Sequence, residues 1–150
     1  MRVWDGGMTA VEAATEASRV EDAVEAFLAD NDPKVMDPVE FRGAVYDAGL
    51  AWIHFPEGWG GMGLPPTLQR IVEQKLRAAG APFPEGRHFF GLALAGPTVV
   101  SHGSDDLKSR TLRRMYTGED SWCQLFSEPG AGSDLAGLGT RAVRDGDEWS

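Results

Sequence analysis

CQLFSEPGAGSDLAG, residues 123–137, is the stretch on which the fold and the function both depend. Residues 121–127 are short, bulky and without a helix cap, so they are predicted to form a strand. In the loop that follows, Gly130, Gly132 and Ser133 are close enough for their N–H groups to converge on an anion. The loop has no Walker lysine, no dinucleotide-binding glycine pattern and no nucleophile elbow. From the residues alone, a plain turn and an anion-binding cradle both stay open.

The sequence before this stretch predicts helices. Thr9 and Glu12 have capping-box spacing at the start of a helix that runs to about residue 29. Asp37 followed by Pro38 is typical of a second helix start. Further helices are predicted from the apolar periodicity over residues 68–76, over residues 89–102 as a buried helix bent or restarted at Pro97, and after the N-cap Ser104.

Two segments without regular helix complete the pattern. Residues 54–66 are rich in Gly and Pro yet carry Phe55, Trp59 and Met62, so this loop is expected to fold back on the core. Residues 140–144 and 147–149 are predicted strands around the hairpin signal Asp145-Gly146. The fold class is therefore mainly α: an N-terminal helical bundle over residues 1–120, then the first strands of a β domain over residues 121–150, cut short.

Composition limits the function classes. The 150 residues are 42% hydrophobic and carry a net charge of −9, which argues against nucleic acid as the main partner. Residues 1–9 are mixed and polar, without the apolar core of a signal peptide, and no apolar run reaches the roughly 20 residues that a membrane span needs, so no membrane span is expected. The chain's one cysteine, Cys123, excludes an intramolecular disulfide, fits a reducing cytoplasm and is expected to be an inert core thiol. The three His show no metal-ligand spacing, so no metal is predicted.

A family resemblance adds to these inferences. CQLFSEPGAGSDLAGLGTRAVRDGDEW closely resembles the acyl-CoA dehydrogenase family at the junction of its N-terminal helical and middle β domains, and residues 128–134 match the hallmark E-P-G-A-G-S-D without a gap. FPEGWGGMGL, residues 55–64, and residues 102–134 resemble two further family passages, so the match runs from about Asp37. Gln124 stands where many members have Tyr, and Arg114 where Pro is common.

The resemblance implies that residues 121–150 begin a β-barrel-like middle domain. It also implies a flavoprotein oxidoreductase of fatty-acid or lipid metabolism, with FAD bound between that middle domain and a C-terminal helical domain. In the family a Glu base removes the α proton of an acyl-CoA while the β hydride passes to the flavin. By carry-over, Ser127 would hydrogen-bond the flavin and Ser133 would also lie near the acyl-CoA phosphates. The residues expected to line the flavin are Gln124, Leu125, Phe126, Ser127, Gly130, Gly132 and Ser133.

The family's base lies in the C-terminal domain, so no catalytic residue is assigned among these 150 residues, and the chain is expected to be a fragment that is inactive alone. Glu128 and Asp134 are expected to bond their own turn. Expected partners are an acyl-CoA substrate, the electron-transfer acceptor of the flavin and other subunits of a homo- or hetero-oligomer in the cytoplasm. Phe89, Phe90, Leu92 and Leu94 either line the acyl-chain tunnel or belong to the core.

Alternatives within and outside the family stay open at this point. An acyl-CoA oxidase or a flavin monooxygenase would share the fold. A non-catalytic partner subunit or a truncated pseudo-enzyme would share the sequence features without the activity.

Overall fold

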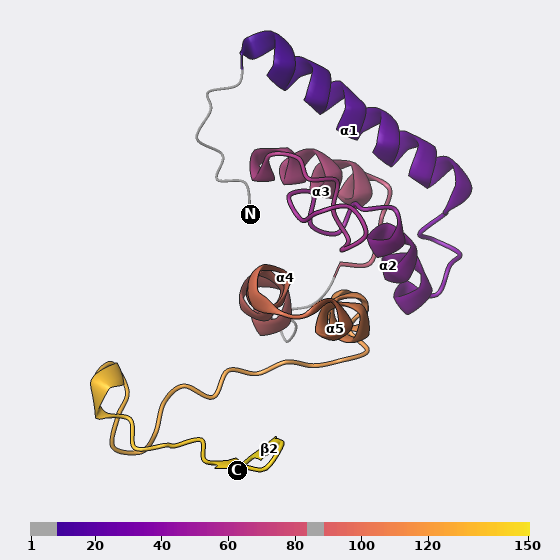
Figure 1. Ribbon diagram of the computed structural model, residues 1–150. Coiled ribbons are helices and arrows are strands. Elements are labelled where there is room, and N and C mark those ends of the chain that lie inside the picture. Colours follow the sequence, from indigo (N-terminus) through magenta and orange to yellow (C-terminus); the bar gives the residue numbers. More distant parts are fainter. Residues whose placement is uncertain (1–8, 84–88) are drawn as a thin grey trace.

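The computed structural model describes residues 9–83 and 89–150 as a helical body and an extended C-terminal arm (Figure 1). The body contains α1 (Ala10–Asp30), α2 (Pro38–Asp47), η1 (Pro66–Leu68), α3 (Gln69–Ala78), the π-helix η3 (Phe90–Ala95), α4 (Gly96–His102) and α5 (Asp105–Thr117). The arm contains η4 (Leu135–Gly137) and the antiparallel strands β1 (Arg144–Asp145) and β2 (Glu148–Trp149). This order confirms the mainly helical fold class. The domain boundary at residue 120 stays a prediction.

Side-chain caps explain where the helices begin. The Glu12 N–H donates to the Thr9 hydroxyl at 3.3 Å, and the Thr9 N–H donates to the Glu12 carboxylate at 2.9 Å, so the predicted capping box is confirmed. The Asp37 carboxylate likewise accepts from backbone N–H groups in the first turn of α2. Ser104 caps α5 in the same way. Each of these caps satisfies donors that a bare helix end leaves unpaired.

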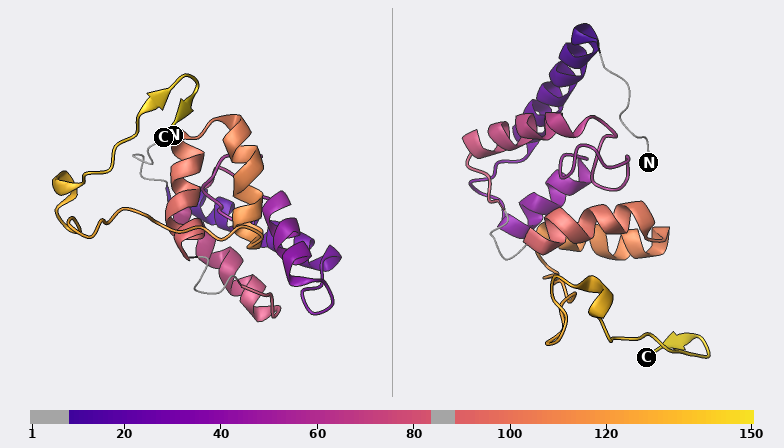
Figure 2. Two further views of the ribbon diagram at one scale, coloured as in Figure 1. Left: turned by 90° about the horizontal axis from the view of Figure 1, so that it is seen from below. Right: turned by 90° about the vertical axis from the view of Figure 1, so that its left-hand side faces the viewer.

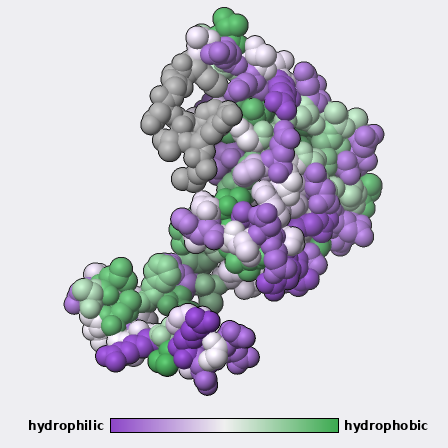
Figure 3. Space-filling model, in the orientation of Figure 1, coloured by the Kyte–Doolittle hydropathy of each residue, from purple (hydrophilic) through white to green (hydrophobic). Residues whose placement is uncertain are grey.

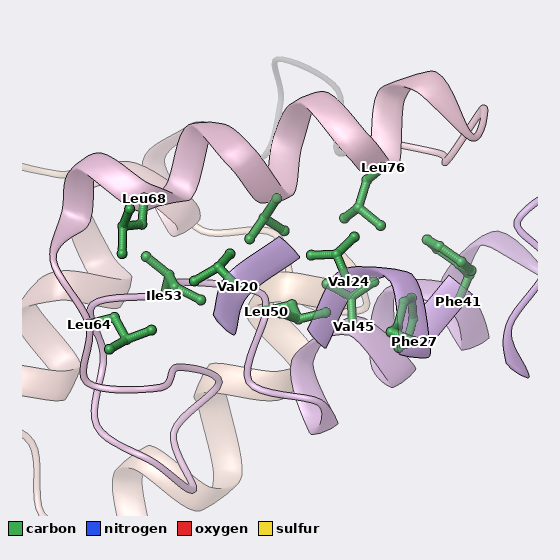
Figure 4. Close-up of a cluster of buried hydrophobic side chains, with 11 residues drawn as sticks. Val20, Val24, Phe27, Phe41, Val45, Leu50, Ile53, Leu64, Leu68 and Leu76 are labelled. Atoms are coloured by element: carbon green, nitrogen blue, oxygen red, sulfur yellow. The ribbon is translucent and has the colours of Figure 1, made fainter. Parts of the chain in front are cut away.

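Two apolar clusters hold the body together. The first lies where α1 and α3 meet α2 and the loop after it (Figure 4). Its buried members are Val20, Val24, Phe27, Phe41, Val45, Leu50, Ile53, Leu64, Leu68, Val72 and Leu76. The second lies where α2 packs near α4 and α5, and consists of Tyr46, Ala51, Trp52, Phe55, Val99, Leu112 and Met115. Burial of these side chains provides the main stabilisation of the body.

The glycine-rich loop after α2 folds back on the core, as predicted. Phe55 is buried at 2% exposure, and Trp59 and Met62 are partly buried. The Trp52 N–H donates to the Gly60 carbonyl at 2.9 Å, which brings the two sides of the loop together. The loop therefore places its aromatic residues in the second cluster without regular helix or strand.

Two predictions of strands and one prediction of burial were wrong. Residues 121–127 are extended but pair with no other strand among the described residues. They do not form a strand, because a strand needs a neighbour to bond its backbone N–H and C=O groups. Of residues 140–144 only Arg144 lies in a strand. The segment over residues 89–102 is helical, as predicted, but it is not buried, since Phe89 and Phe90 are exposed at 58% and 41%. Within that segment a π-helix precedes α4, and Pro97 stands in the first turn of the restarted helix.

No helix in the described part of the chain is both long and apolar enough to cross a membrane.

Candidate functional site

The predicted flavin-lining residues lie on the arm, away from both apolar clusters. The arm leaves the end of α5 and projects away from the helical body (Figures 1 and 2). Leu125 is 89% exposed and Phe126 is 65% exposed. Cys123 is also exposed, so the prediction of a core thiol was wrong, because residue 123 has no sheet to be buried in.

Apolar side chains are concentrated on this arm. Figure 3 shows hydrophobic surface on the part of the molecule that projects below the body. Its exposed large apolar residues are Leu125, Phe126, Leu135, Val143 and Trp149. Single exposed apolar residues are ordinary, but several on one projecting segment mark a surface suited to a ligand or another chain.

The turn within the arm is held by Glu128. Its N–H donates to the Ala131 carbonyl at 2.8 Å, and the Ala131 N–H returns a bond to the Glu128 carbonyl at 3.1 Å. Its carboxylate accepts from the N–H groups of Gly139 at 2.8 Å and Thr140 at 2.7 Å, and from the Thr140 hydroxyl. The hydroxyl bond and the two N–H bonds lower the pKa of Glu128 below its ordinary value. Glu128 thus bonds its own loop, in agreement with the sequence expectation.

The two glycines at the tip of this loop have no role in the packing of the chain itself. A Cβ added at Gly130 or at Gly132 would meet no protein atom within 4 Å, and neither residue has a positive φ. Neither steric crowding nor backbone conformation within the described chain therefore requires glycine there. Close approach of a ligand to the backbone is the remaining common use of glycine in a loop. The loop therefore leaves room for another group to approach the backbone of Gly130 and Gly132.

The loop offers hydrogen-bond donors, and its Glu128 carboxylate is already engaged. Ser133 is exposed beside Gly132 and can present its hydroxyl and N–H outward. Both carboxylate oxygens of Glu128 already accept hydrogen bonds, so this group is not placed to abstract a proton. Within residues 9–83 and 89–150, no three His, Cys, Asp or Glu side chains gather as a metal ion would require. The contact of Gln124, Ser127 and Ser133 with a flavin stays a prediction.

The sequence comparison decides the family. The profile of "Acyl-CoA dehydrogenase, N-terminal domain" matches residues 11–119. The chain belongs to the acyl-CoA dehydrogenase family. As a member of this family, it is 42% identical over 102 residues to acyl-CoA dehydrogenase IpdE1 of Mycobacterium tuberculosis, a match that covers 68% of the chain and 26% of IpdE1. It is 32% identical over 119 residues to (2S)-methylsuccinyl-CoA dehydrogenase of Cereibacter sphaeroides, covering 75% of the chain and 20% of that protein.

Solved structures agree with this assignment. The ChsE4-ChsE5 complex from Mycobacterium tuberculosis matches with a TM-score of 0.51 and 27% identity, over 99% of this chain and 38% of the matched chain. The Tcur3481-Tcur3483 steroid ACAD matches with a TM-score of 0.50 and 27% identity, over 95% and 38%. The chain therefore spans well under half the length of the family members that it matches.

Sequence reasoning missed how two parts of the site region are held. The Trp52 indole N–H donates to the Leu92 carbonyl at 3.2 Å and so connects the second cluster to η3. Thr140, twelve residues after Glu128, supplies two donors to its carboxylate. The sequence shows Thr140 as a possible donor through its N–H and its hydroxyl, but no local pattern indicated that Glu128 is the acceptor. Trp52 belongs mainly to the core, whereas Phe89, Phe90 and Leu94 lie on the surface.

Proposed function

We propose that this chain is the N-terminal part of an FAD-dependent acyl-CoA dehydrogenase, an oxidoreductase that introduces an α,β double bond into an acyl-CoA. The observation that carries the proposal is the loop around Gly130 and Gly132, where the chain itself leaves open the space that a Cβ would fill. Family membership supports the same reaction class. Bound FAD would supply the hydride acceptor that such a dehydrogenation needs.

In this proposal the chain's own residues bind and orient. Gln124, Leu125 and Phe126 would lie along the ring system, and the Ser127 hydroxyl would hydrogen-bond it. Gly130 and Gly132 would let the backbone approach closely, and Ser133 would donate toward the flavin and the acyl-CoA phosphates. Positioning of this kind contributes to catalysis by fixing the reacting groups before the reaction. The proton-abstracting base is assigned to no residue of this chain.

A glycine substitution in the full-length protein tests the proposal. Gly132→Ala adds one methyl group where the flavin is expected, so FAD affinity should fall about tenfold or more, a loss of about 1.4 kcal/mol. Because that methyl group meets no atom of the described chain, the free energy of unfolding without FAD should change by less than about 0.5 kcal/mol. FAD content, its dissociation constant and acyl-CoA-dependent dye reduction would be measured.

Ser121→Thr is the matched control, since it also adds one methyl group to the exposed arm but lies outside residues 124–133. Equal FAD affinity in Gly132→Ala and wild type would contradict the placement of the flavin. A full-length wild-type protein that neither binds FAD nor reduces the dye would reject the function.

We also propose that the protein works as an oligomer with a second, related chain. The ChsE4-ChsE5 complex and the Tcur3481-Tcur3483 steroid ACAD each pair two differently named chains. The exposed apolar side chains of the arm, such as Leu125 and Phe126, support an interface or ligand role for this segment. Native mass spectrometry of the protein co-expressed with its candidate partner would test this, and a monomer under those conditions would contradict it.

A further inference from the structure

Residues 128–140 form a loop whose two ends are held together by one side chain. The Glu128 carboxylate receives donors from Gly139 and Thr140, eleven and twelve residues further along the chain. Two donors are backbone N–H groups at 2.8 and 2.7 Å, and the third is the Thr140 hydroxyl. Hydrogen bonds to an ionised acceptor are about twice as strong as neutral ones, so this carboxylate is well suited to close the loop.

The inside of the loop packs on itself. Ala131 is only 4% exposed, although most of its neighbours on the arm are exposed. A Cβ added at Gly137 would lie 3.6 Å from the Ala131 Cβ and 2.9 Å from a carboxylate oxygen of Asp134, so these three residues crowd together. The Gly137 N–H also donates to the Asp134 carbonyl at 3.1 Å. The loop's shape therefore comes from its own contacts together with the Glu128 closure.

We propose that Glu128 is a positioning residue for the cofactor loop. Its carboxylate fixes the loop in the conformation that turns the backbone of Gly130 and Gly132 and the hydroxyl of Ser133 toward the ligand. This inference rests on the proposed function. Glu128 acts through the loop and not by touching the flavin, because its oxygens are already engaged with Gly139 and Thr140. A loop that is ordered before binding spares the ligand the entropy cost of ordering it.

The test compares Glu128→Ala, Glu128→Gln and Thr140→Val in the full-length protein. Glu128→Ala removes all three bonds, so FAD should bind about tenfold more weakly, and the amides of Gly139 and Thr140 should exchange hydrogen faster without FAD. Thr140→Val removes only the hydroxyl bond and should give a smaller loss. Glu128→Gln keeps one acceptor oxygen and should recover part of the affinity.

Two further readouts separate positioning from general destabilisation. The thermal unfolding of the helical body should be the same in all variants, because the hydrogen bonds of Glu128 all go to residues of the arm. The visible absorption band of the bound flavin should change in Glu128→Ala and return toward wild type in Glu128→Gln. Glu148→Gln is the control, since it makes the same charge change at an exposed position on the same arm.

The outcomes are distinct. Tight FAD binding in wild type with equal affinity in Glu128→Ala would overturn the role of Glu128 and leave the proposed function intact, even if the amides exchanged faster. Loss of affinity that only follows a lower unfolding temperature would also overturn it. Absence of FAD binding in wild type would overturn the proposed function and this inference with it.

Discussion

At the scale of single residues, Gly61 is a glycine whose missing side chain leaves room for bonded backbone atoms of the same loop. A Cβ at Gly61 would lie 2.2 Å from the Phe55 carbonyl oxygen and 2.3 Å from that of Trp52. Both carbonyls accept hydrogen bonds within the loop, from Gly63 at 2.8 Å and from Phe55 at 2.7 Å. Gly61→Ala must therefore move bonded backbone, and we expect it to lower the free energy of unfolding by about 3 kcal/mol or more.

Gly43 provides the matched control in chemical denaturation. A Cβ there would lie 2.3 Å from an Arg113 guanidinium nitrogen, which is the tip of a flexible side chain. That tip can turn away from Asp47, which costs an exposed ion pair worth about 0.2–1 kcal/mol. Ala in place of Gly inside α2 returns about 1 kcal/mol of helix propensity. Gly43→Ala should thus stay within about 1 kcal/mol of wild type, and an equal loss in both variants would contradict the distinction.

At the scale of elements, the first residue of α3 fixes the loop that follows α2. The Gln69 side-chain oxygen accepts from the Ile53 N–H at 2.7 Å, and its amide nitrogen donates to the Ala51 carbonyl at 3.3 Å. Gln69→Leu leaves the buried Ile53 N–H without a partner and should cost about 1–3 kcal/mol of unfolding free energy. Gln74→Leu, on the exposed face of the same helix, should change it by less than about 0.5 kcal/mol. Similar losses in both variants would show that the hydrogen bonds of Gln69 to Ile53 and Ala51 do not contribute to the free energy of unfolding.

Prediction from sequence succeeded for elements with local causes. The Thr9 capping box, the Asp37 N-cap and the Asp145-Gly146 hairpin signal each bring together groups a few residues apart, and all three appear in the structure. In the hairpin, Gly146 takes the positive φ of 64° that the turn needs.

Features with distant causes were not predictable. The prediction of a strand at residues 121–127 was wrong because pairing depends on a partner strand, and those residues alone do not indicate whether one is present. The Trp52 bond to the Leu92 carbonyl in the π-helix η3 joins residues 40 positions apart, so no local pattern indicated it. For the candidate site, the motif indicated the loop and the self-bonding of Glu128. Its role as acceptor for Gly139 and Thr140 was not predictable, because these donors lie eleven and twelve residues further along the chain.

At the scale of the whole molecule, the body and the arm differ in what holds them. Both apolar clusters lie in the body, and Trp122 is the residue of the arm that packs against the second cluster. A Cβ at Gly91 would lie 3.6 Å from the Trp122 Cβ, which places this side chain over η3. Stability should therefore depend on residues up to Trp122 and little on those after it.

Three lengths of the chain test this division by calorimetry. A chain ending at Cys123 keeps Trp122 and should unfold within about 2 °C of the chain ending at Ser150, because the remaining arm buries little apolar area. A chain ending at Asp120 loses the Trp122 contact, and a loss of about 1 kcal/mol would lower its midpoint by about 4 °C. The midpoints of the chains ending at Ser150 and Cys123 could instead differ as much as those of the chains ending at Cys123 and Asp120. The arm would then belong to the same cooperative unit as the helices. The predicted domain boundary near residue 120 would then be wrong.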